Sequence, residues 1–568
     1  MLLVAVFGCG DSVAPGPLAD AGGDARVGDL GPAPDLGPAP DLGPAPDLGP
    51  APDLGPAVDL GMRVDAAVPT ACAPSVVVEP MLGSALYFSD CQAGATAGCV
   101  AGDDANPGTS MDAPRRTLAG IDLDSLAGGT QLLFARGGAW NDFYAPIANR
   151  VATAERPIVF DNYAPSWGGS ARPLLMTSTS GSAFEFGSYT PDGETAAPHG
   201  GYVVRNLVVQ GDGNGWGVWF REGTHDVLVD NCEFRGLAIG FHVGAGDRVV
   251  LRNNDVVDNA EHGLLGAADN FLVEDNRFTR NNPTGGGFEH GMYLSGRHRD
   301  VVVRRNLFDH NSVVGGRCTG GNVTVHGEFD RLLFEDNVIL QDASDLGCYG
   351  FSIVPAYDTA EHFRDVVVRG NTVVNLGCAL CIASAPGIIV ENNVIYSDQP
   401  GGLSIVIPGF RLGPGDDLDT GAIVRNNTIY RTAATPGTTA IALRSGANLT
   451  VTSNLIYDAA GASSTCFEHG PASAFDTFAN NLCFHATPGA GSWSTTFDTL
   501  SAAQAAGLDT NGLDSDPMLM GVPAEANGWA VALSSSSPAI DAGHPTASST
   551  TDRLCGLRTT PDIGAFER

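Results

Sequence analysis

The sequence predicts an all-β solenoid, in which short strands repeat in stacked coils. Between about residues 204 and 483 one phrase recurs: an apolar residue, two residues of any type, Asn, one of any type, and a second apolar residue. Its steps of 22 to 34 residues are typical of solenoids, because each unit can bury its apolar face only against its neighbours. The Asn positions are Asn254, Asn276, Asn306, Asn337, Asn371, Asn393, Asn427, Asn454 and Asn481, and two earlier copies carry Leu207 and Cys232 instead.

The repeat is β rather than α. Apolar positions alternate, as at Val301 and Val303, and β-branched residues dominate them. Each coil has a second short apolar stretch that often begins with Gly, as at 217–220, 240–243, 291–294 and 350–353. The recurrent Asn suits a bend between strands, because Asn tolerates unusual backbone angles and its amide can bond the same amide one coil away. We therefore expect three-sided coils pinned by a column of Asn side chains.

This pattern resembles the right-handed parallel β-helix of the pectate-lyase-like proteins. The resemblance covers residues 126–490, which we expect to form that fold. It implies the fold but no single function, because lyases, hydrolases, epimerases and adhesive proteins share it.

Composition limits the partners and the chemistry. The chain of 568 residues has a net charge of −34, which makes nucleic acid and anionic membranes poor partners. All 30 basic residues are Arg, so no Lys can act as a catalytic base or form a Schiff base. The 12 Cys residues include close pairs that suit an oxidising compartment. These pairs are Cys91/Cys99, Cys378/Cys381 and Cys466/Cys483; Cys378/Cys381 could also be a redox or zinc motif, and Cys232 is expected to be buried and inert.

The N-terminal residues predict a tether. Residues 1–9 are apolar up to Cys9, and residues 6–9 resemble a bacterial lipobox, which implies lipidation of Cys9. Residues 10–71 then repeat Asp-Leu-Gly-Pro-Ala-Pro, a composition that predicts a disordered, extended stalk. We expect a monomer on the bacterial cell envelope, periplasmic or outward-facing, or a secreted protein. Its contact with the membrane would be through the lipid anchor alone, since no later segment is long and apolar enough to span a bilayer.

Both ends of the solenoid are expected to be capped. Residues 72–125 form the entry, with a Gly-Asp-Asp turn at 102–109 that resembles the turn opening many β-helices, and a capping helix at 114–126. Residues 491–568 form a C-terminal capping segment that resembles the end of the surface proteins called choice-of-anchor Q, through Pro-Asp-Ile-Gly-Ala-Phe-Glu at 561–567. We expect it to seal the last coil, with Asp552 paired to Arg558.

One candidate site lies on the second strand of each coil. Residues flanked by core positions should point outward and stack about 4.8 Å apart. Trp219, His242 and Tyr293 would then line one face, and flat rings on such a face suit the apolar faces of sugars. The alternative is a row of incidental exposed aromatics. Taken coil by coil, the column is Trp219, His242, Leu265, Tyr293, Thr324 and Ser352.

The tripeptide Glu-His-Gly is a second signal. It occurs at 261–263, 289–291 and 468–470, and the first two copies occupy the same point of consecutive coils. Stacking should bring His262 near His290, and Glu261 near Glu289. Paired carboxylates can divide acid and base roles, and two His with a carboxylate could instead bind a divalent metal. The alternative is a repeated turn whose His caps backbone carbonyls.

The same region is locally basic. Its Arg and His side chains fit a uronate-containing polysaccharide, and in β-helix lyases an Arg or Lys takes the proton beside the carboxylate, often with Ca²⁺ neutralising that carboxylate. The resemblance therefore implies Ca²⁺ as a cofactor, and here only Arg, His or Tyr could be the base. The alternative is a solvated Arg ladder paired with residues such as Asp300 and Asp309. The basic residues are His290, Arg297, His298, Arg299, Arg304, Arg305, His310 and Arg317.

Two functions remain open from the sequence. The first is a surface-tethered enzyme that cleaves an extracellular polysaccharide, with a lyase favoured over a hydrolase. The second is a non-catalytic adhesin or glycan-binding module. They differ in whether His262, His290 and the Arg residues converge in one groove within about 10 Å. The predicted catalytic residues are Glu261, His262, Glu289, His290, Arg299 and Arg305, and the predicted substrate-binding residues are Trp219, His242, Tyr293 and Arg317.

Overall fold

The computed structural model describes residues 79–568, apart from 178–180, 188–195, 285–288, 343–346, 356–359, 400–402, 410–411, 434–436, 460–463 and 526–529. All described residues belong to one compact unit, Leu60–Arg568. The predicted lipidation site Cys9 and the predicted stalk at 10–71 lie outside the described residues. No helix in the described part of the chain is long and apolar enough to cross a bilayer.

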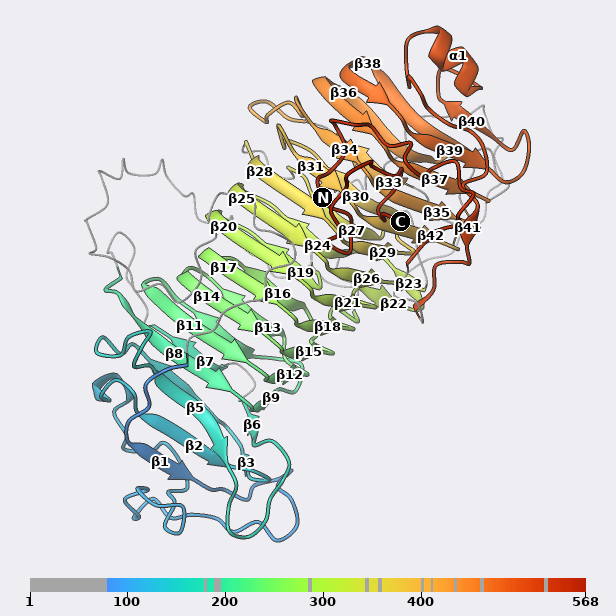
Figure 1. The fold of residues 1–568 in the computed structure, drawn as a ribbon. Coiled ribbons are helices and arrows are strands. Elements are labelled where there is room, and N and C mark those ends of the chain that lie inside the picture. Colours follow the sequence, from blue (N-terminus) through green and yellow to red (C-terminus); the bar gives the residue numbers. More distant parts are fainter. Residues whose placement is uncertain are drawn as a thin grey trace, which may run out of the picture. The chain divides into compact units, whose positions relative to one another are not determined.

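Each coil contains up to three short strands, which we call in chain order the first, second and third faces (Figure 1). Strands of one face pair in parallel with those of the neighbouring coils, so the predicted parallel β-helix is confirmed. The first face consists of β4 (Ala145–Ile147), β7 (Ser182–Phe186), β10 (Trp216–Phe220), β13 (Ile239–Val243), β16 (His262–Gly266), β19 (Met292–Leu294), β24 (Gly321–Val325), β27 (Tyr349–Ile353), β30 (Cys378–Ile382), β33 (Leu403–Ile407) and β40 (Gly491–Ser494).

The second face joins the first in one 25-stranded sheet. The junction is made by β36 (Thr439–Thr452) and β38 (Ser464–Ala479), which run through both faces without a break. The second face proper consists of β1 (Ala85–Phe88), β2 (Gln131–Ala135), β5 (Ile158–Tyr163), β8 (His199–Arg205), β11 (Thr224–Asp230), β14 (Asp247–Arg252), β17 (Asp269–Glu274), β20 (Arg297–Arg304), β25 (Glu328–Glu335), β28 (His362–Arg369), β31 (Ile389–Glu391) and β34 (Ile423–Arg425).

The third face is a separate 13-stranded sheet. Outside the coils lie the antiparallel pairs β22 (Val313–Val314) with β23 (Arg317–Cys318) and β41 (Leu519–Met520) with β42 (Ala532–Leu533). The third face consists of β3 (Ala139–Trp140), β6 (Leu174–Met176), β9 (Val208–Gln210), β12 (Glu233–Arg235), β15 (Asp255–Val257), β18 (Arg277–Thr279), β21 (Leu307–Asp309), β26 (Val338–Leu340), β29 (Thr372–Val374), β32 (Val394–Ser397), β35 (Thr428–Arg431), β37 (Leu455–Asp458) and β39 (Leu482–His485).

The predicted Asn column lies at the corner between the second and third faces, which we call the ladder corner. Asn254 Nδ2 donates to Asn276 Oδ1 at 2.9 Å, and Asn276 to Asn306 at 3.0 Å. The series continues to Asn481, which donates to Asp509 Oδ1 at 3.0 Å. The unusual backbone angle falls on the residue before each ladder position, such as Asn253 with φ 54°, rather than on the ladder Asn itself.

A second Asn column was missed by the sequence reading. It lies at the corner between the third and first faces, which we call the glycine corner. Asn259 Nδ2 donates to Asn281 Oδ1 at 2.9 Å, and Asn281 to Asn311 at 3.0 Å. The signal was present, because each of these Asn residues follows a ladder Asn by five positions in three successive coils. This column holds the glycine corner in place, and the strands of the first face start just after that corner.

The entry cap differs from the predicted helix at 114–126. Only the 3-10 helix η1 (Leu123–Ser125) forms there. Arg115 is instead in extended pairing, since its carbonyl accepts from Ser89 N at 2.9 Å. Gly120 has φ 77°, which a helix does not allow. The sequence reading treated this stretch as helical and overlooked both the Gly and the edge pairing.

The C-terminal segment seals the last coil and then turns back. Helix α1 (Leu500–Ala505) precedes residues that pair with the last coil, where Asn480 N donates to Thr510 O and Cys483 N to Leu513 O, both at 2.9 Å. Residues 539–567, which we call the strap, then run along the ladder corner towards earlier coils. The strap contacts, from late to early coils, are Ala542 O with Asn480, His544 N with Ser453, Ser549 N with Asn426, Thr551 O with Asn392, and Arg553 with Asn371 O.

Inside the strap the predicted pairing of Asp552 with Arg558 is replaced by two other contacts. Arg558 pairs with Glu567 at 2.6 Å, and Asp552 accepts from Gly556 N at 2.6 Å. The strap thus folds on itself through these contacts, and it binds the corner through its backbone and through the Arg553 side chain.

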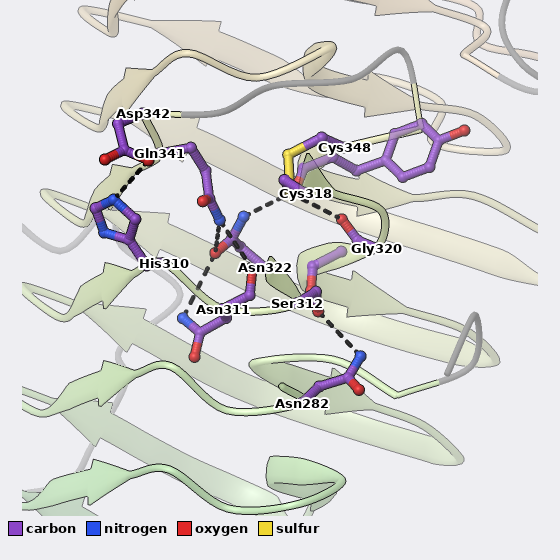
Figure 2. Close-up of a disulfide and its surroundings, with 12 residues drawn as sticks. Asn282, His310, Asn311, Ser312, Cys318, Gly320, Asn322, Gln341, Asp342 and Cys348 are labelled. Atoms are coloured by element: carbon purple, nitrogen blue, oxygen red, sulfur yellow. Dashed lines mark hydrogen bonds and ion pairs between the residues drawn. A yellow bond between two sulfur atoms is a disulfide. The ribbon is translucent and has the colours of Figure 1, made fainter. Parts of the chain in front are cut away.

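The three predicted cysteine pairs are disulfides: Cys91–Cys99, Cys378–Cys381 and Cys466–Cys483. A fourth, Cys318–Cys348, ties the β22–β23 hairpin to the loop before β27. Figure 2 shows this disulfide beside the end of the second Asn column, where Asn311 and Gln341 both approach Asn322. Cys232 is buried and free, as expected, and burial raises the pKa of its thiol to about 12.

Candidate functional site

The outward column of the first face has the predicted register. Trp219 is level with His242, His242 with Leu265, and Leu265 with Tyr293. Thr324 and Ser352 follow in the next two coils. The strand periodicity read from the sequence therefore located this column correctly.

Glycines explain why the two Glu-His-Gly copies meet. A side chain at Gly263 would place its Cβ 2.8 Å from Phe278 Cδ1 in the core, and one at Gly240 would lie 2.6 Å from Val256 Cγ1. Gly is therefore required where the chain enters the first face. The residue just before each Gly is left at the glycine corner, and His262 and His290 occupy that position in consecutive coils.

Five side chains form what we call the His–Tyr cluster: His262, His290, Tyr293, His326 and Glu361. The ring centroids of His262 and His290 lie 6.0 Å apart, and Tyr293 lies 5.9 Å from the first and 5.5 Å from the second. The His326 ring lies 5.5 Å from Tyr293, and its Nδ1 is 3.3 Å from Glu361 Oε2. His326 and Glu361 were missed from the sequence, because no repeated motif marks them.

Hydrogen bonds fix the protonation of the two cluster His residues. His262 Nδ1 accepts from His290 N at 3.0 Å, and His290 Nδ1 accepts from Gly321 N at 3.2 Å. A neutral ring that accepts at Nδ1 carries its proton on Nε2. Burial lowers the pKa of His262 to about 4 and that of His290 to about 3. At neutral pH both rings are thus uncharged Nε2–H donors and weak bases.

The carboxylates of the Glu-His-Gly copies differ in exposure. Glu261 is exposed, whereas Glu289 is half-buried, and its Oε2 is buried without a hydrogen-bond partner among the described residues. The third copy is not equivalent, because Glu468 is level with Ala442 in the outward column and pairs with Arg444 at 3.1 Å. Glu289 is therefore the carboxylate best placed to act beside His290.

Trp219 and His242 form a packed stack. Their rings are parallel within 4°, with centroids 5.7 Å apart, and the Arg221 guanidinium lies 3.3 Å from the Trp219 ring centroid. Trp216 stands perpendicular to both rings at 4.5 Å. Both faces of Trp219 are consequently occupied, so a sugar ring could stack on it only by displacing Arg221 or His242.

The predicted Arg group does not converge on the His–Tyr cluster. Arg304 lies on the outward side of the second face and pairs with Glu274 at 2.9 Å, and Arg305 at the ladder corner pairs with Glu274 and Asp275, both at 2.8 Å. They belong to a column in which acidic and basic residues alternate from coil to coil. Its members are Asp161, Arg205, Asp230, Arg252, Glu274, Arg304, Glu335, Arg369, Glu391 and Arg425.

Arg299 lies in a separate cavity of about 250 Å³ at the start of the second-face strands. It is 3.4 Å from Asp269, and the neighbouring Arg297 pairs with Glu328 at 2.9 Å. Arg317 lies on the β22–β23 hairpin. The hairpin is followed closely by Gly321, whose N–H donates to His290 Nδ1. Of the predicted Arg residues, Arg317 is thus the one on the same corner as the cluster.

The predicted metal alternative has little support in the geometry of the cluster. Among the residues that the structure describes, one group of three His, Cys, Asp or Glu has ligand atoms close enough for an ion, and it is Cys466, Cys483 and His485 in the last coil. His262 and His290 instead use Nδ1 to accept backbone hydrogen bonds.

Comparison with known families identifies the fold. The profile of the family described as "Right handed beta helix region" matches residues 191–339 and 354–492, together just over half of the chain. The mannuronan C-5 epimerase AlgE6 A-module of Azotobacter vinelandii is similar over 63% of this chain and 91% of its own, at 16% identity and TM-score 0.43. The pectate lyase Pel9A is similar over 85% and 97%, at 14% identity and TM-score 0.33. No curated protein matches the sequence.

Proposed function

The chain belongs to the right handed β-helix family, and we propose that it binds an extracellular polysaccharide along the first face and cleaves it at the His–Tyr cluster. The observation that carries this proposal is the order of side chains on the first face. Trp219 and His242 are followed, within the next coils, by His262, His290 and Tyr293. Rings at successive coil spacings can contact the successive units of a saccharide chain, and at Trp219 this contact requires the Arg221 guanidinium to move off the ring.

A lyase reaction fits these side chains better than hydrolysis. The uncharged Nε2–H groups of His262 and His290 can donate to the acid group of a uronate, which makes the adjacent carbon-bound proton more acidic. The Tyr293 ring lies within 6 Å of these two rings and of His326, ring centre to ring centre, so its hydroxyl is the candidate to take that proton as base. Glu289 can take the phenolic proton that Tyr293 gives up as it becomes the base, and can then pass this proton to the leaving oxygen. A Ca²⁺ ion bound with the substrate is a second way to neutralise the acid group.

The test is a panel of pectate, alginate and glycosaminoglycan, each with and without a chelator. Lyase activity introduces a double bond, which is measured by ultraviolet absorbance, whereas hydrolysis releases reducing ends without it. Tyr293→Phe should lower the rate by about 10²–10⁴-fold, the usual contribution of a general base. Ser352→Ala is the matched control, because Ser352 occupies the same outward column two coils away. No product from any substrate would refute cleavage.

A non-catalytic glycan-binding module is the second candidate. It is favoured by one observation: Arg299, Arg304 and Arg305 are paired with carboxylates on other faces and corners, so they bring no positive charge to the cluster to stabilise a developing anion. In that case glycan binding would occur without cleavage and would be the same for wild type and His290→Ala.

Attachment to the envelope is a further part of the proposal. We propose that Cys9 is lipidated and that residues 10–71 hold the solenoid, as a monomer, away from the membrane. Fatty-acid labelling of the full chain, lost in Cys9→Ser, is the expected result. Equal labelling of both chains would contradict it.

A further inference from the structure

Three donor groups meet in the last coil, away from the His–Tyr cluster. Cys466 lies on β38, and Cys483 and His485 lie on β39. His485 Nε2 is 3.6 Å from Cys466 Sγ and 3.7 Å from Cys483 Sγ. In the described part of the chain, the disulfides Cys91–Cys99, Cys318–Cys348 and Cys378–Cys381 belong to no such group of ligand atoms with a His.

The two sulfurs are bonded to each other in this structure. We propose that this disulfide is the closed form of a metal site, and that its reduction opens a site in which two thiolates and His485 bind Zn²⁺ or a similar divalent cation. The site is independent of the proposed polysaccharide chemistry.

The position of His485 carries the proposal. Tetrahedral Zn²⁺ has bonds of about 2.3 Å to sulfur and about 2.0–2.1 Å to nitrogen, which places neighbouring S and N ligands about 3.6 Å apart. His485 Nε2 already has that separation from both sulfurs. The two sulfurs have only to move apart once the bond between them breaks.

The surroundings favour a bound cation once the thiols are free. Cys466 is 0% and Cys483 3% exposed, and both belong to the apolar core with Phe467 and Trp493. Two thiolates in such a place are costly alone, whereas one divalent cation balances both charges. His485 is half-buried, so the fourth ligand position can be taken by water. Gly491 makes room for the ring, because a Cβ there would lie 2.3 Å from His485 Cε1.

The chemistry balances with a thiol reductant. Two small thiols are oxidised to their disulfide as the Cys466–Cys483 bond takes up two electrons and two protons. The metal then displaces the two thiol protons. His485 Nε2 now lies 3.2 Å from Ser492 O, so it must give up any proton it donates there and carry its proton on Nδ1 when it binds the metal.

The experiment titrates Co²⁺ into the intact protein before and after reduction with a phosphine, and follows the thiolate-to-metal charge-transfer absorption. The reduced wild type should gain this band at one equivalent, and the oxidised protein should not. His485→Ala should weaken binding by at least about 10-fold. The Cys378→Ser/Cys381→Ser variant is the matched control, because it removes another buried close pair, and it should keep the band.

Several results would overturn the proposal. One is the absence of the band in reduced wild type, and another is an equally strong band in His485→Ala. A third is a disulfide that stays closed in the folded protein, shown by mass spectrometry after alkylation, because a site that cannot open binds no metal. Loss of the band in the Cys378→Ser/Cys381→Ser control would place the metal elsewhere.

Discussion

The first and second faces are built from the same coils, yet their outward columns differ in kind. On the second face, acidic and basic residues alternate and pair, as Glu274 does with Arg304 and Glu335 with Arg369. On the first face, the outward column and the adjoining corner carry His and Tyr rings that contact one another without charge, and His262 and His290 are neutral. Parallel stacking keeps every column in register along the solenoid. Ion pairs can therefore stabilise the second face, while the side chains of the first face are not needed for ion pairing and can serve a reaction.

The largest expected difference between the faces is in activity. His290→Ala should lower cleavage by about 10²–10⁴-fold, since it removes both a donor and the packing beside Tyr293. Arg304→Gln on the second face should leave the rate of the folded protein unchanged. Initial rates on the preferred polysaccharide, below the unfolding temperature of both variants, measure this. An equal loss of cleavage rate in both variants would contradict the assignment of the reaction to the first face.

The next effect is on stability. Glu335 has a side chain 1% exposed and pairs with Arg369 at 2.6 Å. Glu335→Gln should lower the free energy of unfolding by about 3–5 kcal/mol, because it removes one carboxylate from a buried ion pair and leaves the charge of the Arg369 guanidinium less fully compensated. The control is Arg277→Ala, which breaks an exposed third-face pair with Asp255 at 3.5 Å and should cost less than about 1 kcal/mol. Urea denaturation gives both values, and similar losses would show that the alternating column is not a structural element.

The next prediction concerns Asp509, which accepts the last hydrogen bond of the Asn column. It accepts from Asn481 through Oδ1, and burial raises its pKa to about 7. The folded state therefore favours the protonated form, and stability from this group is present at low pH and lost as pH rises from about 4 to about 7. Asp509→Asn should match wild type at pH 4 and be more stable at pH 8, by about 1–4 kcal/mol. A difference independent of pH would show that the carboxyl does not titrate there.

The His–Tyr cluster should give the opposite pH dependence. Its folded-state pKa values, about 4 for His262 and about 3 for His290, lie below the ordinary value of 6.5. Their contribution to stability is therefore complete above pH 6.5 and lost as pH falls below it. The His262→Gln/His290→Gln variant should show a flatter decline in melting temperature between pH 6.5 and pH 4. An unchanged slope would mean that these rings are protonated in the folded protein.

The smallest effect concerns Trp219. Arg221 covers one face of its ring and pairs with Glu185. Arg221→Ala should uncover that face and strengthen binding of a neutral oligosaccharide by a few fold, about 0.5–1 kcal/mol. Isothermal titration measures the change, with Arg235→Ala on the third face as control. Weaker binding in Arg221→Ala would instead make the guanidinium a direct ligand.

The sequence predicted what depends on a repeating period and failed where contacts are local. The Asn column and the register from Trp219 to Ser352 follow from alternation and coil length, so both are confirmed. The helix at 114–126 fails, because Gly120 and the edge pairing of Arg115 override its composition. His326 and Glu361 could not be found, since their contact joins coils of different length without a shared motif. The Arg residues were grouped by sequence distance, whereas strand direction sends Arg299, Arg305 and Arg317 to different corners.

The most direct measurement is the ultraviolet absorbance of unsaturated product from a polyuronate, compared between wild type and Tyr293→Phe with equal melting temperatures. Wild type is expected to generate the product, and Tyr293→Phe is expected to lose nearly all of it. Binding without product in wild type, or equal product from both proteins, would contradict chemistry at the first face.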